Sequence, residues 1–311
     1  MPEPLHLLID GAAPPTDDGA ALPPLPPLPQ LEALLRRLQA AGRIDCGDDA
    51  PDTPFERALA QAHGLSGAPG QRPWAAFEQG VVGTPCAWMR PCHWQLGMDH
   101  VTLLDPALLA LTEVESRALL AAVQPLLAED GIALHYVRAS TWLAQGELLR
   151  GLTTWSLARA ARQPITRDVL AAAPTPAQGA QLRRLQNECQ MLLYPHPVNE
   201  AREAARQWPV NALWLDGAGV LDQALAPARG LRVEQRLAQA GTDPAAQAAA
   251  WQAIDADAVA ALRQQLHAGT DVRLTLCGPR QAHSFMAGRG LRFKISSLFK
   301  PLRLQDVREQ L

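Results

Sequence analysis

The chain has 311 residues, 48% of them hydrophobic, and a formal net charge of −3 at pH 7. A chain of this length and composition buries a substantial core, which excludes fibrous and wholly disordered proteins. The slightly acidic balance argues against a protein that binds polyanions over its whole surface, so nucleic acid is not an expected partner.

The N-terminal residues and the cysteines indicate a compartment. Met1–Pro4 lacks the basic start and long apolar run of a signal peptide, and no apolar stretch approaches the roughly 18 residues of a membrane helix. The five cysteines are an odd, scattered set, which fits reduced thiols better than a disulfide framework. We therefore expect a cytoplasmic protein with no membrane contact.

The N-terminal segment begins with a short apolar run over 5–9, which predicts a buried strand that ends at Asp10-Gly11. A Pro-rich loop over 11–30 follows. A stiff surface loop is the first interpretation of this loop, and a polyproline ligand for a protein partner is the second.

Helix and strand signals then follow one another along the chain. In the N-terminal half, they predict helices over 31–38 and 54–63, and a short helix that leads into a strand around 74–82 and is broken by Thr84-Pro85. A helix over 113–128 and a strand over 132–137 follow. In the C-terminal half, they predict a helix over 178–193, a strand over 210–215, a long helix over 242–267 and a strand over 272–277. This alternation is typical of an α/β fold with a mainly parallel sheet flanked by helices. We expect a single α/β domain over 1–311, with room for an inserted subdomain around 85–180.

Parallel sheets place ligands beyond the carboxyl ends of their strands. Three apolar runs end in polar or glycine turns, at Asp10-Gly11, Asp216-Gly217-Ala218-Gly219 and Gly278-Pro279-Arg280. Asp10 could be a metal ligand, although an Asp-Gly pair after a strand is also ordinary turn chemistry. Gly217-Ala218-Gly219 is similar to a phosphate-binding turn, but Asp222 stands where the dinucleotide motif needs its third glycine. A nucleotide site is therefore not expected there.

Two further clusters leave alternatives open. The predicted helix over 182–193 carries Arg183, Asn187 and Glu188, and His196-Pro197-Val198-Asn199 and Arg202 follow it. This mixed polar cluster is either a clamp that holds loops or a binding site. The basic tail over 289–303 is either a solvated strand face or a surface that contacts a phosphate backbone or an acidic partner.

Several of these segments resemble one known family. They are Pro91–Val101 (PCHWQLGMDHV), Leu185–Leu193 (LQNECQMLL), His196–Asn199 (HPVN) with Arg202, and Pro209–Gly219 (PVNALWLDGAG). Together they are similar to the RpfE-type regulatory proteins of proteobacteria, which are distantly similar to archaeal-type cofactor-independent phosphoglycerate mutases. The resemblance is strongest from about 85 to 220.

The resemblance implies a reduced alkaline-phosphatase-like α/β core of the phosphoglycerate-mutase type. Asp10 then falls where such enzymes place their first metal-binding aspartate. A two-metal site needs further Asp and His ligands to stabilise the attacking and leaving oxygens. The last third of the chain lacks the Gly-His and Asp-His pairs of the enzymes, and the only Asp-His pair is Asp99-His100.

The expected function is therefore a catalytically degenerate phosphoglycerate-mutase-like protein that acts as a regulatory or binding protein. Its expected partner is a protein or a small phosphorylated or acidic ligand, and no cofactor is expected. The expected ligand-binding residues are Asn187, Glu188, His196, Asn199, Arg202, Asn211 and Trp214. The alternative is a metal-dependent phosphoglycerate mutase or phosphohydrolase that uses Mn or Mg, with Asp10 as one ligand.

Overall fold

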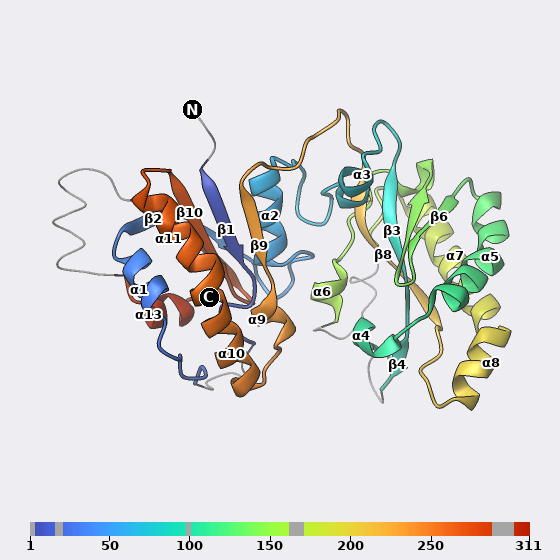
Figure 1. Cartoon of the computed structure of the whole chain (residues 1–311). Helices are drawn as coiled ribbons and strands as arrows, with labels where there is room; N and C mark the ends of the chain where they lie inside the picture. Colours follow the sequence, from blue (N-terminus) through green and yellow to red (C-terminus); the bar gives the residue numbers. More distant parts are fainter. Residues whose placement is uncertain (1–3, 16–20, 98–100, 162–170, 288–301) are drawn as a thin grey trace. The chain divides into compact units, whose positions relative to one another are not determined.

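The computed structural model describes residues 4–15, 21–97, 101–161, 171–287 and 302–311. The chain divides into two compact units (Figure 1). The first unit comprises residues 1–49, 53–64 and 227–311, and the second comprises residues 50–52 and 65–226. The first unit is thus built from both ends of the chain, and the predicted insertion around 85–180 lies inside the second unit.

The first unit contains a five-stranded mixed sheet in the order β2-β11-β10-β1-β9. Its strands are β1 (Leu5–Ile9), β2 (Leu38–Asp45), β9 (Leu231–Glu234), β10 (Val272–Cys277) and β11 (Gln281–Ala287). β1 runs parallel to β9 and β10, whereas β11 runs antiparallel to β10 and β2.

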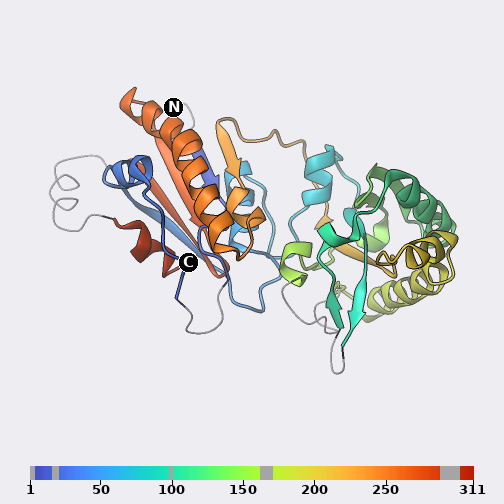
Figure 2. The same ribbon diagram turned by 60° about the horizontal axis from the view of Figure 1, so that its bottom comes forward.

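Helices cover both faces of this sheet (Figures 1 and 2). They are α1 (Pro29–Leu35), α2 (Pro54–His63), α9 (Arg236–Gln239), α10 (Pro244–Ile254), α11 (Ala260–His267) and α13 (Leu304–Arg308), with a π-helical turn η2 (Asp255–Val259) between α10 and α11. Side chains alternate between the faces of a strand. Leu7 and Ile9 accordingly join the core under α1, α10 and α11, while Leu8 packs with Phe55 of α2.

The second unit contains a four-stranded sheet in the order β6-β7-β3-β8. Its strands are β3 (Cys86–Cys92), β6 (Ala133–Arg138), β7 (Thr141–Gln145) and β8 (Ala212–Gly219), and β4 (Trp94–Leu96) and β5 (Val101–Leu103) form a separate hairpin. All neighbouring strands are antiparallel.

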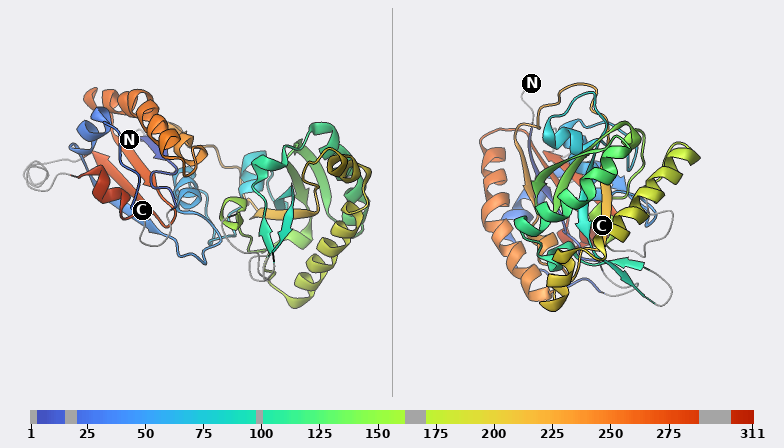
Figure 3. Two further views of the ribbon diagram at one scale, coloured as in Figure 1. Left: turned by 90° about the horizontal axis from the view of Figure 1, so that it is seen from below. Right: turned by 90° about the vertical axis from the view of Figure 1, so that its right-hand side faces the viewer.

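The helices of the second unit lie on both sides of its sheet. They are α3 (Trp74–Gln79), α4 (Pro106–Leu109), α5 (Glu113–Glu129), α6 (Leu157–Ala160), α7 (Pro176–Leu193) and α8 (Pro197–Ala204), with a 3₁₀ turn η1 (Glu147–Leu149). The long helices α5 and α7 share one face (Figure 3), where their apolar residues meet Met89 of β3 and Trp142 of β7.

The expectation of a mainly parallel sheet is wrong. The predicted strands are separated by helices, a spacing that suits parallel pairs, whereas β2, β7, β9 and β11 are not predicted. β7 and β11 form short hairpins with β6 and β10, through connections of two and three residues, and turns this short can join only antiparallel neighbours. The outer strand β2 is mostly exposed, so it lacks the apolar alternation that identifies a strand.

The two glycines of Gly217-Ala218-Gly219 lie inside strand β8 rather than in a turn after it. Gly217 has a φ of +60°, and the pairing of β8 with β3 is irregular between Cys86 and Trp88. An added Cβ on Gly219 would lie 2.9 Å from the Cα of Pro73. Close packing under the start of α3 therefore accounts for Gly219 without a bound phosphate.

The π-helical turn η2 places Asp255 at the N-terminus of α1. Its carboxylate accepts hydrogen bonds from the backbone N–H groups of Leu31 (2.7 Å) and Gln30 (3.2 Å). The residue before α1, Leu28, provides no side-chain cap. Asp255, which is 5% exposed, therefore supplies from another helix the acceptor that the first turn of α1 requires.

Replacing Asp255 with alanine should destabilise α1 by about 1 kcal/mol, the usual cost of a lost cap. Faster hydrogen exchange of the α1 amides would report this change. Asp257→Ala is the matched control two residues along η2, because the Asp257 carboxylate is exposed and bonds to Arg232 instead. Equal exchange of α1 in both variants would contradict the capping role.

In the part of the chain that the structure describes, no helix has the length and apolar character needed to cross a membrane.

Candidate ligand pocket

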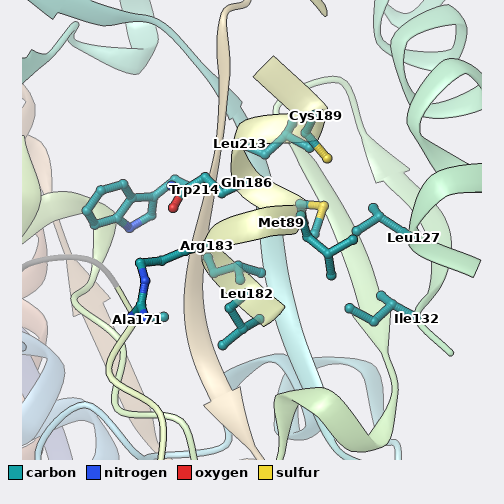
Figure 4. A pocket seen from close by; sticks show the side chains of 12 residues that line it. Met89, Leu127, Ile132, Ala171, Leu182, Arg183, Gln186, Cys189, Leu213 and Trp214 are labelled. Carbon is teal, nitrogen blue, oxygen red and sulfur yellow. The ribbon is translucent and has the colours of Figure 1, made fainter. Parts of the chain in front are cut away.

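An apolar pocket lies in the second unit between α7 and β8 (Figure 4). Its lining residues come from α7, α5, the sheet and two loop positions. They are Met89, Leu127, Ile132, Ala171, Leu182, Arg183, Leu185, Gln186, Cys189, Leu213, Trp214 and Leu215. Ligand pockets of proteins typically combine such an apolar lining with a few polar groups that orient the ligand.

The spacing of apolar residues on α7 builds one wall of the pocket. Leu182, Leu185 and Cys189 are buried and recur at helical spacing, so they share the face of α7 that meets the sheet. The opposite wall is β8, which is the outer strand of its sheet. An outer strand has no neighbour on one side, so the successive residues Leu213, Trp214 and Leu215 can all reach the pocket although they point to alternate faces.

Figure 4 shows how these side chains are distributed around β8. The Arg183 side chain extends beside Ala171, on the side of β8 where the Trp214 ring lies. Met89, Leu127 and Ile132 lie on the other side. The pocket therefore extends around the edge of β8, from a wholly apolar part to a part that includes a cation and an indole ring.

Two polar side chains of α7, Arg183 and Gln186, line the pocket. Neither has a hydrogen bond or an ion pair with another residue within the described part of the chain. By contrast, Arg184 forms ion pairs with Asp130 (2.6 Å) and Glu188 (3.3 Å). Arg184 is thus paired within the protein, whereas Arg183 and Gln186 are two polar side chains of α7 that are available to a ligand in the pocket.

The thiol of Cys189 belongs to the apolar wall. Burial, with a smaller effect of the Glu188 charge, raises the pKa of this thiol to about 12. The thiol therefore stays protonated at neutral pH and behaves as a small apolar group rather than as a nucleophile.

The structure places most of the sequence-predicted site residues in the protein's own hydrogen-bond network. Asn199 of α8 is 2% exposed; its Nδ2 donates to the carbonyls of Leu193 and Val210, both at 2.7 Å, and its Oδ1 accepts from the Val210 N–H at 2.8 Å. Asn199 thus ties the end of α7 to the segment that enters β8.

Arg202, one turn further along α8, is also 2% exposed. Its guanidinium donates to the carbonyl of Trp208 (2.8 Å), to the carboxylate of Glu115 (2.9 Å) and to the carbonyl of Leu109. The pKa of Glu115 is lowered: its burial would raise it, but hydrogen bonds from Thr112 and Arg202 outweigh that effect. Arg202 therefore joins α8, α4 and the start of α5.

Asn211 and His196 also contact the backbone around them. Asn211 Oδ1 accepts from the Trp94 N–H (2.7 Å), and its Nδ2 donates to the Trp94 carbonyl (3.0 Å). His196 Nδ1 accepts from the N–H of Val198 and caps α8. Both side chains hold local backbone, which is the clamp interpretation of the predicted cluster.

The remaining three residues of the predicted set lie on α7 and β8. Asn187 is exposed, and Glu188 pairs with Arg184. Trp214 is buried, lines the pocket, and donates from its indole Nε1 to the carbonyl of Trp155 at 3.0 Å. Trp214 is thus the member of the predicted set that meets the pocket.

Asp10 lies in the first unit, at the end of β1, whereas the other predicted site residues lie in the second. Its N–H donates to the carbonyl of Glu234, and the Gly11 that follows has a φ of +77° and packs against the backbone of Ala238. No group of three or more His, Cys, Asp or Glu side chains that could hold a metal ion occurs among the described residues.

Sequence reasoning does not select Arg183 and Gln186 as binding residues. Arg183 belongs to the predicted polar cluster, but nothing in the sequence shows which face of the helix meets the outer strand of a sheet. Arg183 and Gln186 each directly follow one of the buried leucines Leu182 and Leu185, at the same spacing of three residues. This spacing is the one sequence signal that places the two polar residues beside the apolar wall.

Comparisons with known proteins show only distant similarity. No protein-family model matches the chain, and no curated protein matches it. Among solved structures, it is similar to a cofactor-independent phosphoglycerate mutase from Thermoplasma acidophilum DSM 1728, with 14% identity over 98% of both chains and a TM-score of 0.38. It is also similar to the PH0037 protein from Pyrococcus horikoshii, with 14% identity over 93% of this chain and 88% of the other, and a TM-score of 0.44.

Proposed function

We propose that the protein is a catalytically degenerate, RpfE-type regulatory protein that binds a small ligand in the pocket between α7 and β8. The observation that carries this proposal is the pocket itself: an apolar cavity at the edge of a sheet, with Arg183 and Gln186 as polar groups that have no partner within the described part of the chain. The resemblance of segments 91–101, 185–193 and 209–219 to the RpfE-type proteins supports the regulatory class.

The segments that carry this resemblance also support the pocket. Residues 185–193 form the C-terminal half of α7, and residues 209–219 include all of β8. Asn199 and Arg202 fix α8 and the entry to β8, and Asn211 fixes the start of that strand against β4. In this proposal, the predicted polar residues hold the two walls in place, and residues on the walls contact the ligand.

Methionine methyl signals can test this proposal in the intact protein. The chain has five methionines, and Met89 lines the pocket, whereas Met286 lies in the first unit. In protein labelled with ¹³C at the methionine methyl groups, we expect octanoate or 1-octanol to shift the Met89 signal and to leave Met286 unchanged.

A matched pair of variants separates pocket binding from nonspecific binding. Gln186→Trp should fill the pocket from its rim and remove the Met89 shift. Gln190→Trp introduces the same side chain one turn further along α7, outside the lining, and should keep the shift. Met89 shifts of equal size in both variants, or no shift in the unmodified protein, would contradict the proposal.

The alternative is a Mn- or Mg-dependent phosphoglycerate mutase or phosphohydrolase. That activity would require about two bound metal ions per chain, because both reacting oxygens of the phosphoryl transfer need stabilisation. Elemental analysis of protein incubated with Mn and then dialysed tests this requirement. Two retained Mn per chain together with phosphoryl transfer, both abolished by Asp10→Ala, would replace the proposal with the enzyme.

A further inference from the structure

We propose that the ligand of the α7–β8 pocket is a small amphiphilic carboxylate, with an apolar body in the pocket and a head group that Arg183 binds. This inference rests on the proposed function and adds the chemical class of the ligand. Three features of the pocket support it: its size, its charge and the position of its polar groups.

The size and lining of the pocket select the apolar body. The cavity has a volume of about 60 Å³. On this measure one water needs about 10–15 Å³, so the cavity has room for several waters or for a short alkyl chain. Apolar residues from α5, α7 and the sheet surround this space, and an alkyl or aryl group is what such a wall binds best.

The charge of the lining selects an anionic head group. Arg183 is the single charged residue among the lining residues named above, and the lining contains no carboxylate. The neighbouring cation, Arg184, is already paired with Asp130 and Glu188. The pocket therefore has a net positive charge that the described protein does not neutralise, beside an apolar wall.

The positions of the polar groups favour a carboxylate over a phosphate. A guanidinium binds a carboxylate through two parallel N–H···O bonds, which satisfies a single negative charge. Gln186 lies one turn along α7 from Arg183 and can donate a third hydrogen bond through its amide. A phosphate monoester carries nearly two charges at pH 7, and the lining offers one cation.

Gly179 leaves room for the Arg183 guanidinium. An added Cβ at Gly179 would lie 3.3 Å from Nη1 of Arg183. The glycine is one turn before Arg183 on α7, so the arginine can pass over it to the side of β8 where the Trp214 ring lies (Figure 4). A carboxylate at Arg183 would thus lie at the mouth of the pocket, with its chain directed toward Met89 and Leu127.

The test compares octanoate with 1-octanol, which has the same chain length and no charge, at pH 7 in the intact protein. Dissociation constants come from the Met89 methyl shift. We expect Arg183→Gln to weaken octanoate binding about fivefold relative to octanol, the size expected for one partly exposed charge pair. Arg184→Gln changes the neighbouring cation and should leave that ratio within about twofold.

The outcomes separate this inference from the proposed function. If both probes shift Met89 but Arg183→Gln leaves the ratio of their dissociation constants unchanged, the carboxylate assignment is wrong and the pocket remains. Tighter binding of octyl phosphate than of octanoate would also overturn the assignment. If neither probe shifts Met89 in the unmodified protein, the proposed function fails along with the inference.

Discussion

Replacing Arg202 with methionine is expected to lower the free energy of unfolding of the second unit by about 4 kcal/mol. Arg202 is 2% exposed, and its guanidinium binds Glu115 and the carbonyls of Trp208 and Leu109. Methionine fills a similar volume but donates no hydrogen bond, so the variant leaves the two carbonyls without this donor. It also leaves the Glu115 carboxylate without its cation, although Thr112 still donates to that carboxylate. Removing one partner of a buried ion pair is among the most destabilising single changes.

Urea unfolding followed by tryptophan fluorescence measures this effect, because every tryptophan except Trp251 lies in the second unit. Arg117→Met is the matched control, since Arg117 forms an exposed ion pair with Glu113 at 2.8 Å. We expect that variant to lose less than about 1 kcal/mol. If Arg202→Met lowers the free energy of unfolding as little as Arg117→Met does, the Arg202 guanidinium is not structural. Arg202 would then again be a candidate ligand-binding residue.

The stability of the first unit is expected to fall as the pH is lowered from 7.5 to 5, with His6 contributing about 2 kcal/mol. His6 lies on β1, with Nε2 2.8 Å from Oγ1 of Thr275, which is itself 2.8 Å from Oγ of Ser284. Burial, reinforced by the charge of Arg273, lowers the pKa of His6 from 6.5 to about 4. The imidazole is therefore neutral in the folded protein at pH 5.

The direction of this pH dependence follows from the difference in the His6 pKa between the folded and the unfolded protein. Well above pH 6.5 His6 is neutral whether the protein is folded or not, so its contribution to stability is constant there. As the pH falls, the unfolded chain binds a proton that the folded protein does not bind, and the folded state loses stability until the pH reaches about 4.

Hydrogen exchange of the β1 and β10 amides over a urea series, at pH 7.5 and pH 5, measures this pH dependence. His6→Gln keeps a neutral polar group and removes the titration, so the difference between the two proteins isolates His6 from the carboxylates. A variant that loses as much stability as the unmodified protein between the two pH values would show that His6 does not titrate in this way.

The sequence predicts most helices of this fold because their signals are local. The helix over 54–63 is found at the predicted residues, and Thr53 and Glu56 form the capping box that begins it. The helix over 242–267 is found as α10, η2 and α11, but the π-helical turn is not predictable, since it depends on Asp255 reaching α1.

Strand order is less predictable because it depends on contacts between distant residues. β10 is found at the predicted residues, yet its neighbour β11 alternates too weakly to identify as a strand. Without β2, β7 and β11, the remaining strands suggest a parallel sheet. The pairing of β1 with β10 joins residues more than 260 positions apart, and no local pattern specifies it.

The residues of the candidate ligand site are also difficult to predict from the sequence. Polar residues such as Asn199 and Arg202 stand out in the sequence. The residue type alone, however, does not distinguish a polar side chain that binds a ligand from one that holds a loop in place. Only the fold shows that Asn199 and Arg202 bind the protein itself, and that Arg183 and Gln186 face a pocket. Trp214 does both, because its buried indole ring lines the pocket while its Nε1 donates a hydrogen bond to a backbone carbonyl.

Intermolecular nuclear Overhauser effects between octanoate and the methionine methyl groups locate the bound ligand. If octanoate binds in the pocket between α7 and β8, we expect contacts from its chain to the methyl group of Met89, and none to exposed Met191 or to Met286 of the first unit. Contacts to Met191 or Met286 with none to Met89 would show that the pocket is not the ligand site.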